Sequence, residues 1–282
     1  MLSSIAHLVY DCRALPKETN ANDMLASPGT LELLQPQTIS IFDYTLLPPL
    51  APQEEDHSAA ILVDQPAAIT HRFDQLAGFK VTVRVANEPG VVEEWVKSVS
   101  NSLQTVEMKI VGLDCEFTDQ VHGVKQKDLP LEMQRRAAVL QLCVADDCLV
   151  YHIMHSPRIP DELKKFLARE DIFFCGAAIG QDVKMLEPYG LHIKKPIDLQ
   201  ERIDIPITTC SKPTPSLFDL ANFVLGTNLE KGKECKQLKS SGWEITPLNF
   251  QQIRYAAFDA LISFEIAKGA TILGYMRLDE LA

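Results

Sequence analysis

An apolar run that ends in two acidic residues is the feature that most constrains this sequence. Residues 110–117 read IVGLDCEF, so Asp114 and Glu116 follow a stretch typical of a buried β-strand. Because a strand alternates its side chains between two faces, both carboxylates point the same way. Two such carboxylates repel each other unless a cation lies between them. The alternative is a strand end that emerges into solvent, where acids are common.

Two later segments carry further acids in positions that suit a site. Asp182 follows the short apolar run 172–175 and a Gly-containing turn, where a helix is expected to begin. There it is either a helix cap or dipole partner, or a site residue. Tyr255 and Asp259 are four residues apart in the helical pattern of 250–270, so they share one helix face. They either hydrogen-bond each other or belong to a site, and the alanines around them allow another backbone to approach closely.

Together the three segments resemble the DEDDy 3′–5′ exonucleases, the family of the Werner syndrome protein's exonuclease domain and of bacterial ribonuclease D. The family's Asp-x-Glu motif matches Asp114 and Glu116. Its second motif, an Asp after a Gly-containing turn, matches Asp182, and its Tyr-x-x-x-Asp motif matches Tyr255 and Asp259. The likeness extends over about residues 79–275 and also includes the segments 137–144 and 215–226 and the one around Trp243.

The resemblance implies a metal-dependent 3′–5′ exonuclease that acts on DNA or RNA by a two-metal mechanism. Two divalent ions about 3.5–4 Å apart stabilise the attacking and leaving oxygens of a phosphodiester, and hard ions such as Mg²⁺ or Mn²⁺ prefer carboxylate oxygens. The implied role of Tyr255 is to orient or deprotonate the attacking water. The implied metal ligands are Asp114, Glu116, Asp182 and Asp259.

Two other functions stay open. One is a catalytically silent ribonuclease H-like module that binds nucleic acid or protein. The other is a different metal-dependent phosphodiesterase that acts on short oligonucleotides. The presence of all five motif residues favours the exonuclease over a silent module, because a site released from its function tends to lose at least one of them.

The chain departs from the family beside the first motif. Phe117 stands where members usually have Trp, and the stretch from Thr118 to Arg136 is longer than in close relatives. This loop carries four bases, and we expect them to hold the phosphate backbone of the substrate. The alternative is a solvated surface loop. The four bases are Lys125, Lys127, Arg135 and Arg136.

The order of the expected elements predicts an α/β fold of the ribonuclease H-like class, a mixed β-sheet flanked by helices. A hairpin turn is expected at Asp146-Asp147, and Gly176 and Gly180 are expected to form the turn before Asp182. We expect His152 and His155 to be bystanders and Asp198 to be structural. The predicted strands are 79–86, 109–115, 137–145, 148–153, 172–175 and 196–199, and the predicted helices are 91–99, 160–169 and 181–188, with 215–275 mainly helical.

Residues 76–282 are predicted to form the exonuclease domain, and residues 1–75 a partly irregular N-terminal extension rich in proline. Two interpretations of the extension stay open. It either packs on the enzyme or recruits a protein partner, or it is a flexible tail without a catalytic role. Residues 61–75 are expected to add an edge strand.

The net charge of the chain is unusual for a protein that binds nucleic acid. Its net charge is −11, which does not favour a nucleic-acid binder. Most of the excess lies in residues 1–78, with three Lys or Arg and ten Asp or Glu. Two bound divalent ions would offset the negative charge of the acids in the site.

The chain has seven cysteines without a Cys-x-x-Cys pattern, which favours a reducing compartment, nuclear or cytoplasmic. No membrane span or secretory signal is expected.

Overall fold

The structure is a computed structural model of the chain that describes residues 39–40, 68–121, 124–125, 127, 135–206, 213–230 and 242–278. All of these belong to one compact unit, Gln37–Ala282. The predicted extension, residues 1–75, lies outside the described residues except for 39–40 and 68–75. Its boundary and its role therefore stay predictions.

Seven strands form one mixed sheet in the order β10-β9-β4-β7-β8-β3-β2. Strand β4 lies inside the sheet, parallel to β9 and antiparallel to β7. β2 pairs antiparallel with β3 at one edge, where the sequence predicted an added strand. The bounds are β2 (Ala68–Leu76), β3 (Phe79–Ala86), β4 (Ile110–Thr118), β7 (Arg136–Val144), β8 (Asp147–Tyr151), β9 (Phe173–Gly176) and β10 (Pro196–Asp198).

Two short strand pairs lie outside this sheet. β1 (Ile39–Ser40) pairs in parallel with β11 (Leu229–Glu230). β5 (Gln120–Val121) and β6 (Val124–Lys125) form a small antiparallel pair within the loop that follows β4.

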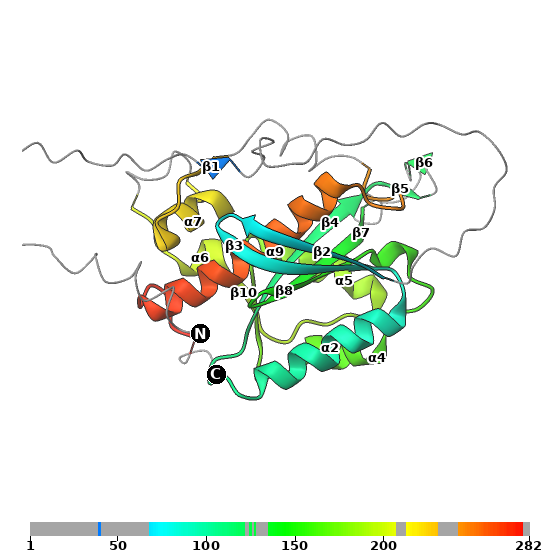
Figure 1. Cartoon of the computed structure of the whole chain (residues 1–282), viewed down its shortest axis with the longest axis horizontal. Helices are drawn as coiled ribbons and strands as arrows, with labels where there is room; N and C mark the ends of the chain where they lie inside the picture. The colour runs from blue at the N-terminus through cyan, green and yellow to red at the C-terminus, as the bar shows by residue number, and fades with distance from the viewer. Residues whose placement is uncertain are drawn as a thin grey trace, which may run out of the picture. The chain divides into compact units, whose positions relative to one another are not determined.

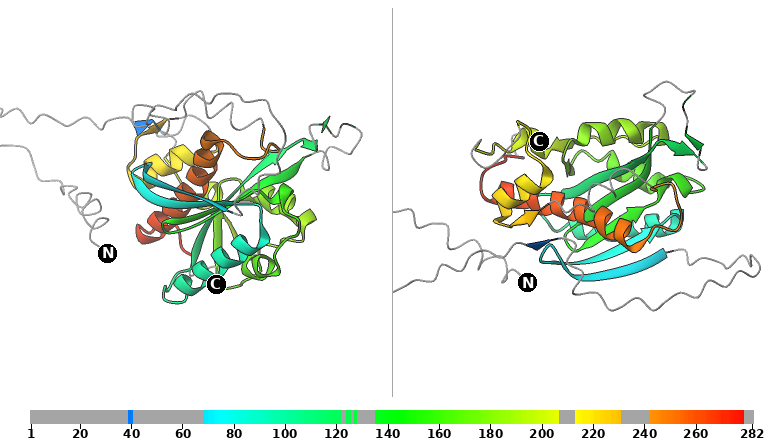
Figure 2. Two further views of the ribbon diagram at one scale, coloured as in Figure 1. Left: turned by 45° about the vertical axis from the view of Figure 1, so that its right-hand side comes forward. Right: turned by 90° about the horizontal axis from the view of Figure 1, so that it is seen from above.

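Helices cover both faces of the sheet, as the sequence predicted (Figures 1 and 2). Alternate residues of β4, among them Val111 and Leu113, join the core under three helices, α2 (Pro89–Leu103), α4 (Asp161–Leu167) and α5 (Ile179–Leu186). Ile110 faces the other core, which is built from α7 (Leu217–Leu225) and α9 (Phe250–Ile272). The short helices are η3 (Ile153–His155), η4 (Glu187–Tyr189) and α6 (Leu199–Arg202).

Helix α9 is the longest helix described, and it is buried over most of its length. Its N-terminus is closed by a capping box, in which the Asn249 side chain accepts from the Gln252 backbone and the Gln252 side chain accepts from the Asn249 backbone. The helix lies directly on β4, because Gly112 has no side chain and Ala260 has a small one. The close backbone approach expected from the alanines of this helix is therefore confirmed.

Two local predictions are wrong in detail. The turn between β7 and β8 is Ala145-Asp146, not Asp146-Asp147, and Ala145 has a positive φ of 54°. Asp147 is the first residue of β8, where its carboxylate contacts Arg84 Nη2 at 3.1 Å and accepts from Trp95 Nε1 at 2.9 Å. Helix α2 begins at Pro89, two residues before the predicted start at 91, because proline suits the first helical position.

Four cysteines of the described sheet are free and buried: Cys115, Cys143, Cys148 and Cys175. Buried in the sheet and without a disulfide, they act as small core residues. In the described part of the chain, no helix combines the length and the apolar character needed to cross a membrane.

Candidate active site

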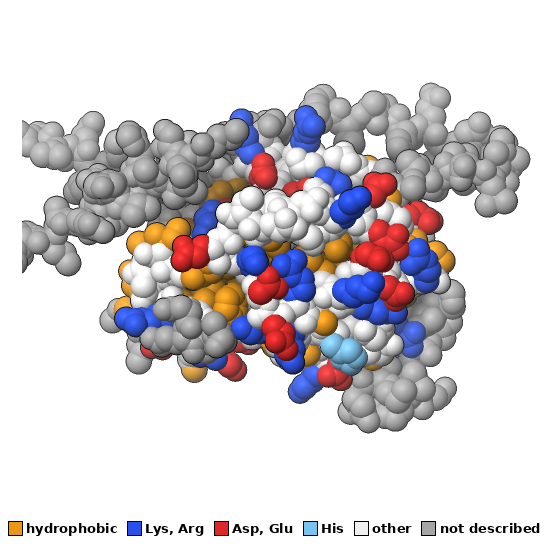
Figure 3. All heavy atoms as spheres, turned by 90° about the horizontal axis from the view of Figure 1, so that it is seen from below, with side chains coloured by type: hydrophobic (Ala, Val, Ile, Leu, Met, Phe, Trp, Pro, Cys, Tyr) orange, Lys and Arg blue, Asp and Glu red, His pale blue; other side chains and the backbone are white. Residues whose placement is uncertain are grey.

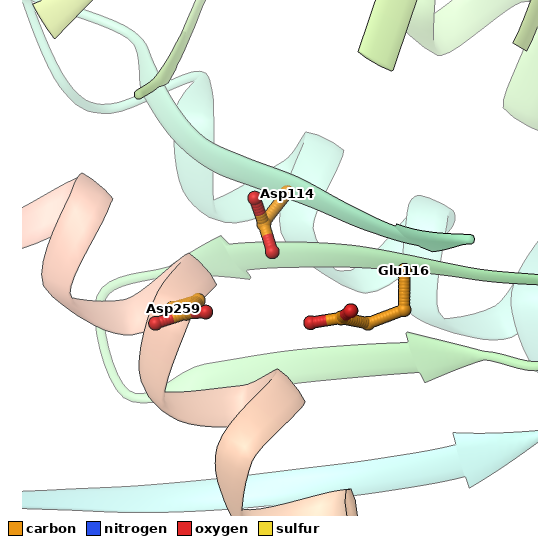
Figure 4. Close-up of side chains that lie close together, drawn as sticks. All are labelled: Asp114, Glu116 and Asp259. Atoms are coloured by element: carbon orange, nitrogen blue, oxygen red, sulfur yellow. The ribbon is translucent and has the colours of Figure 1, made fainter. Parts of the chain in front are cut away.

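Three carboxylates converge between β4 and α9. Oxygen atoms of Asp114, Glu116 and Asp259 all lie within 4.8 Å of one another. Figure 4 shows Asp114 and Glu116 projecting from the strand and Asp259 from the helix, with the three side chains pointing toward one space. Asp114 and Glu116 thus lie on one face of the strand, as the sequence predicted, and the helix supplies the third acid.

Local structure explains how the strand presents its two acids. Asp114 pairs with Gln141 of β7, and Glu116 pairs with Val139. The regular pairing ends there, because the register between β4 and β7 shifts between Glu116 and Phe117. Such a bulge twists the strand and redirects its side chains. The two acids therefore occupy the last regular positions of β4 on the face covered by α9.

The donor set fits a hard divalent cation. All three groups offer carboxylate oxygens, which Mg²⁺ and Mn²⁺ prefer. Around one Mg²⁺ at about 2.0–2.1 Å, ligand oxygens lie at most about 4 Å apart, and the three acids bring oxygens within 4.8 Å of one another. Glu116 and Asp259 are only 6% and 8% exposed, and a cation would offset the mutual repulsion of buried carboxylates.

Asp182 is buried on α5 beside these three but outside their cluster of oxygen atoms. Burial first, and then repulsion from Asp198 and Asp259, raise the pKa of Asp182 to about 8. Its carboxyl group is therefore close enough to Asp259 to interact electrostatically. Asp198 itself accepts from the backbone N–H groups of Gln200 at 2.9 Å and Ala178 at 3.2 Å, which is the structural role expected for it.

The turn before Asp182 is made differently from the prediction. Gly176 is required, because a Cβ atom there would press on the Leu113 carbonyl oxygen. Gly180 lies inside α5 with open space around its Cα atom, so the turn does not depend on it. The residue with left-handed backbone is Ala178, with φ 57° and ψ 31°. An alanine there carries a strain of about 1–2 kcal/mol that glycine would not.

Tyr255 lies one turn before Asp259 on α9 and is 2% exposed. Burial raises the pKa of Tyr255 far above its usual range, and the charges of Asp259, Glu116 and Asp114 raise it further. A hydrogen bond with the Asp259 side chain acts in the same direction. The phenol therefore keeps its proton at neutral pH, and its hydroxyl is placed among the three acids.

The four loop bases do not form one described surface. Lys125 pairs with Asp119 at 3.1 Å, and Lys127 is exposed. Arg135 lies over the Phe117 ring, 5.1 Å from its centroid. Arg136 begins β7 opposite Thr118, and its buried Nε atom has no hydrogen-bond partner among the residues described. Arg135 and Arg136 are thus adjacent to the end of β4, whereas residues 128–134 lie outside the description.

The sequence analysis did not single out one buried polar residue beside the site, Gln141, nor the contacts that two histidines make. Gln141, opposite Asp114, is fully buried, and neither atom of its amide has a hydrogen-bond partner in the described structure. A lone polar residue in the apolar run 137–144 was the available signal for it. His152 and His155, expected to be bystanders, lie outside the cluster of acids and contact the backbone of the segment before α9. No sequence pattern indicated those long-range contacts.

Comparison with known sequences and structures places the chain in a family. The profile of the 3′–5′ exonuclease domain matches residues 91–269. A 3′–5′ exonuclease of Arabidopsis thaliana is 31% identical over 160 residues, which cover 56% of this chain and 51% of that protein. The bifunctional 3′–5′ exonuclease/ATP-dependent helicase WRN of Mus musculus is 30% identical over 161 residues, or 56% of this chain and 11% of that protein. The chain thus spans about half or less of these relatives.

The fold agrees with this match. Escherichia coli ribonuclease D, at 17% identity, superposes with a TM-score of 0.50 over 70% of this chain and 48% of that chain. The mixed sheet with helices on both faces is thus the ribonuclease H-like α/β fold. The acidic cluster on β4 and α9 lies within the matched residues. The chain belongs to the 3′–5′ exonuclease family.

Proposed function

We propose that the protein is a metal-dependent 3′–5′ exonuclease that hydrolyses phosphodiester bonds from the 3′ end of DNA or RNA. One observation carries the proposal: oxygens of Asp114, Glu116 and Asp259, from a strand and a distant helix, come within 4.8 Å of one another in a chain of this family. Buried acids are costly to bring together without a cation.

Each acid has a role in this proposal. Asp114, Glu116 and Asp259 would hold one Mg²⁺ or Mn²⁺ ion, and Asp182, buried beside Asp259, would serve a second ion. When bound, the two ions offset the charge that develops on the attacked phosphate and on the leaving oxygen. Asp182 must lose its proton before it can serve as a ligand, so binding of the second ion competes with a proton.

Tyr255 acts as a positioned hydroxyl and not as a free phenolate. Its raised pKa keeps the proton on the phenol oxygen, so a role as a phenolate base is disfavoured. The hydroxyl instead orients the attacking water, and its hydrogen bond to Asp259 holds it beside the acids. Holding a reacting group in the right orientation accelerates a reaction strongly, so even a small displacement of the attacking water would lower the rate.

The substrate backbone is bound by the bases of the loop after β4, Lys125, Lys127, Arg135 and Arg136, which lie in a chain of net charge −11. Residues 76–282 form the catalytic domain in this proposal, and the extension 1–75 offers a docking segment for a protein partner. The free, buried cysteines suit a nuclear or cytoplasmic location.

The test uses single-stranded DNA, single-stranded RNA and a 3′-recessed DNA duplex, each labelled at the 5′ end and incubated with Mg²⁺ or Mn²⁺. We expect a ladder that shortens from the 3′ end and that disappears in EDTA. Single substitutions of Asp114, Glu116, Asp182 and Asp259 by Ala should nearly abolish it, with native circular dichroism. A substrate with a blocked 3′ end is the control for internal cleavage. Binding without any product in all lanes would instead support a silent nucleic-acid-binding module.

A further inference from the structure

Two histidines contact each other at the end of β8. His152 directly follows the strand, and His155 ends the short helix η3. Their rings are edge to face, with centroids 4.4 Å apart. The backbone N–H of His152 donates to Ala86 of β3 at 2.8 Å, and the N–H of His155 donates to the His152 carbonyl at 3.1 Å. The pair is therefore fixed to the central sheet.

Both rings hold the same distant segment. His152 Nε2 lies 2.8 Å from the Trp243 carbonyl oxygen, and His155 Nε2 lies 2.6 Å from the Glu244 carbonyl oxygen. A carbonyl oxygen only accepts hydrogen bonds, so each Nε2 atom must carry the donated hydrogen. Burial lowers the pKa of His152 to about 4, so its ring is neutral and has its one N–H at Nε2. The consecutive carbonyl groups of Trp243 and Glu244 thus accept from the two histidine rings, which clamp this segment.

The clamped segment, residues 242–244, also joins the two elements that carry the acids. The Gly242 carbonyl accepts from Gln252 Nε2 of α9 at 3.0 Å. Thr118 Oγ1, at the end of β4, donates to Glu244 Oε2 at 2.8 Å. Thr118 follows Glu116 by two residues, and Gln252 precedes Tyr255 by one helical turn. The segment therefore bridges β4 and α9 at the end where the acids lie.

The Trp243 side chain lies between the clamp and Tyr255. It is fully buried, and its ring centroid lies 6.3 Å from that of Tyr255, with the rings tilted by 43°. Contact between the two rings limits where the Tyr255 hydroxyl can go. A shift of the 242–244 segment would therefore move Trp243 against Tyr255.

We propose that His152 and His155 are positioning residues, which clamp residues 242–244 so that Trp243 holds the Tyr255 hydroxyl in place beside the acids. This inference rests on the proposed function for its effect on catalysis, and it assigns a role to two residues that carry none in the motif. Both rings contact the backbone of residues 243 and 244, so we assign their effect on Tyr255 to that segment.

The experiment compares two double variants of the full chain: His152→Gln with His155→Gln, called the Gln variant, and His152→Asn with His155→Asn, called the Asn variant. Gln places an amide N–H near the position of Nε2 and should keep the donor, whereas Asn places it near Nδ1 and should lose it. The chain has two tryptophans, so 5-fluorotryptophan labelling yields one ¹⁹F resonance for Trp243 and one for Trp95. Trp95 packs against the opposite core and serves as the internal control. Single substitutions of the half-exposed His155 replace the double variants if these do not fold.

In the Asn variant we expect the Trp243 resonance to move while the Trp95 resonance stays. We also expect kcat to fall about 10- to 100-fold, the scale of a small misplacement, with KM and the Kd for Mn²⁺ unchanged. The Gln variant should keep both the resonance and kcat. The clamp is rejected by a Trp243 resonance that does not move in the Asn variant, by equal losses in Asn and Gln variants, or by a loss confined to Mn²⁺ binding. The resonances and the Mn²⁺ titration need no substrate, so they judge the clamp even if the parent hydrolyses nothing, a result that would reject only the proposed function.

Discussion

Gly112 of β4 and Ala260 of α9 touch so closely that a Cβ atom at position 112 would overlap the Ala260 carbonyl oxygen and approach Phe264. Gly112 precedes Asp114 by two residues on the same face of the strand, and Ala260 directly follows Asp259. The contact that sets the separation of helix and strand therefore lies beside the acids from both elements.

We predict that Gly112→Ala weakens metal binding and catalysis together. The added methyl group meets backbone atoms of α9, which cannot rotate away, so the helix must move and carry Asp259 from Asp114 and Glu116. Overpacking of this kind costs about 1–3 kcal/mol of the free energy of unfolding. Titration of free Mn²⁺ by electron paramagnetic resonance and urea unfolding measure the two effects.

Gly180→Ala is the matched control for this prediction. Gly180 lies inside α5, where an added Cβ atom meets nothing within 4 Å. The substitution should leave Mn²⁺ binding unchanged and add about 0.5–1 kcal/mol of stability, because alanine loses less backbone entropy than glycine in a helix. Wild-type Mn²⁺ affinity in Gly112→Ala would show that the contact does not set the geometry of the acids.

Tyr255→Phe tests the hydroxyl without removing the ring. The phenyl ring keeps the contact with Trp243, and the acids remain in place. If the hydroxyl positions the water, kcat should fall about 10²–10⁴-fold while the Kd for Mn²⁺ changes little. Single-turnover hydrolysis and Mn²⁺ titration separate the two quantities. Wild-type turnover with a wild-type pH profile would remove Tyr255 from the mechanism.

The pKa of Asp182 makes the stability of the metal-free protein depend on pH. In the folded protein the carboxyl group keeps its proton up to about pH 8, whereas in the unfolded chain it ionises near pH 3.8. Between these values the folded state binds more protons, so its stability falls as pH rises, by at most about 1.4 kcal/mol per pH unit. Below pH 3.8 the stability that the protonated carboxyl group of Asp182 contributes is fully present, and above about pH 8 that stability is lost.

Urea unfolding in EDTA across that window measures the slope, and Asp182→Asn is the control. The amide cannot ionise, so the variant should be less sensitive to pH and more stable than the parent near pH 8. Parallel pH dependence of the two proteins would show that Asp182 is already ionised in the fold.

Neutralising the four loop bases to Gln should weaken binding of all nucleic-acid sequences alike. Each lost phosphate contact lowers the slope of log K against log salt by about one unit. A quadruple control, Lys97, Lys164, Lys165 and Lys194 to Gln, removes equal charge from bases outside that loop, three of them on α2 and α4. The surface seen in Figure 3 from the side of these helices intersperses acids with bases, which does not favour a phosphate track there. Equal losses of nucleic-acid affinity in both quadruple variants would mean that binding depends only on net charge and not on the position of the loop bases.

Gln141→Met tests the buried amide opposite Asp114. The amide has no hydrogen-bond partner in the described structure, and methionine has nearly the same shape without polar N and O atoms. Removing such a group should raise the free energy of unfolding by about 1 kcal/mol, measured by urea unfolding. Destabilisation of similar size would indicate that the amide is satisfied in solution, for example by a buried water.

Local periodicity was enough to predict the parts of the site that one element determines. The alternation of a strand puts Asp114 and Glu116 on one face, and the helical spacing puts Tyr255 and Asp259 one turn apart. Both follow from backbone geometry that neighbouring residues dictate. The mixed sheet also followed from the order of apolar runs, although the β7–β8 turn was misplaced by one residue because Asp147 has distant partners in Arg84 and Trp95.

The tertiary structure alone decided which residues meet across elements. The family resemblance had implied that Asp259 joins Asp114 and Glu116, but only the packing of α9 on β4 brings them together, leaves Asp182 outside their cluster, and sets His152 and His155 against residues 243 and 244. The contact of Gly112 with Ala260 joins residues 148 positions apart. Such contacts depend on how helix and sheet pack, and packing is set by the shapes of many side chains at once, so no local pattern in the sequence specifies them.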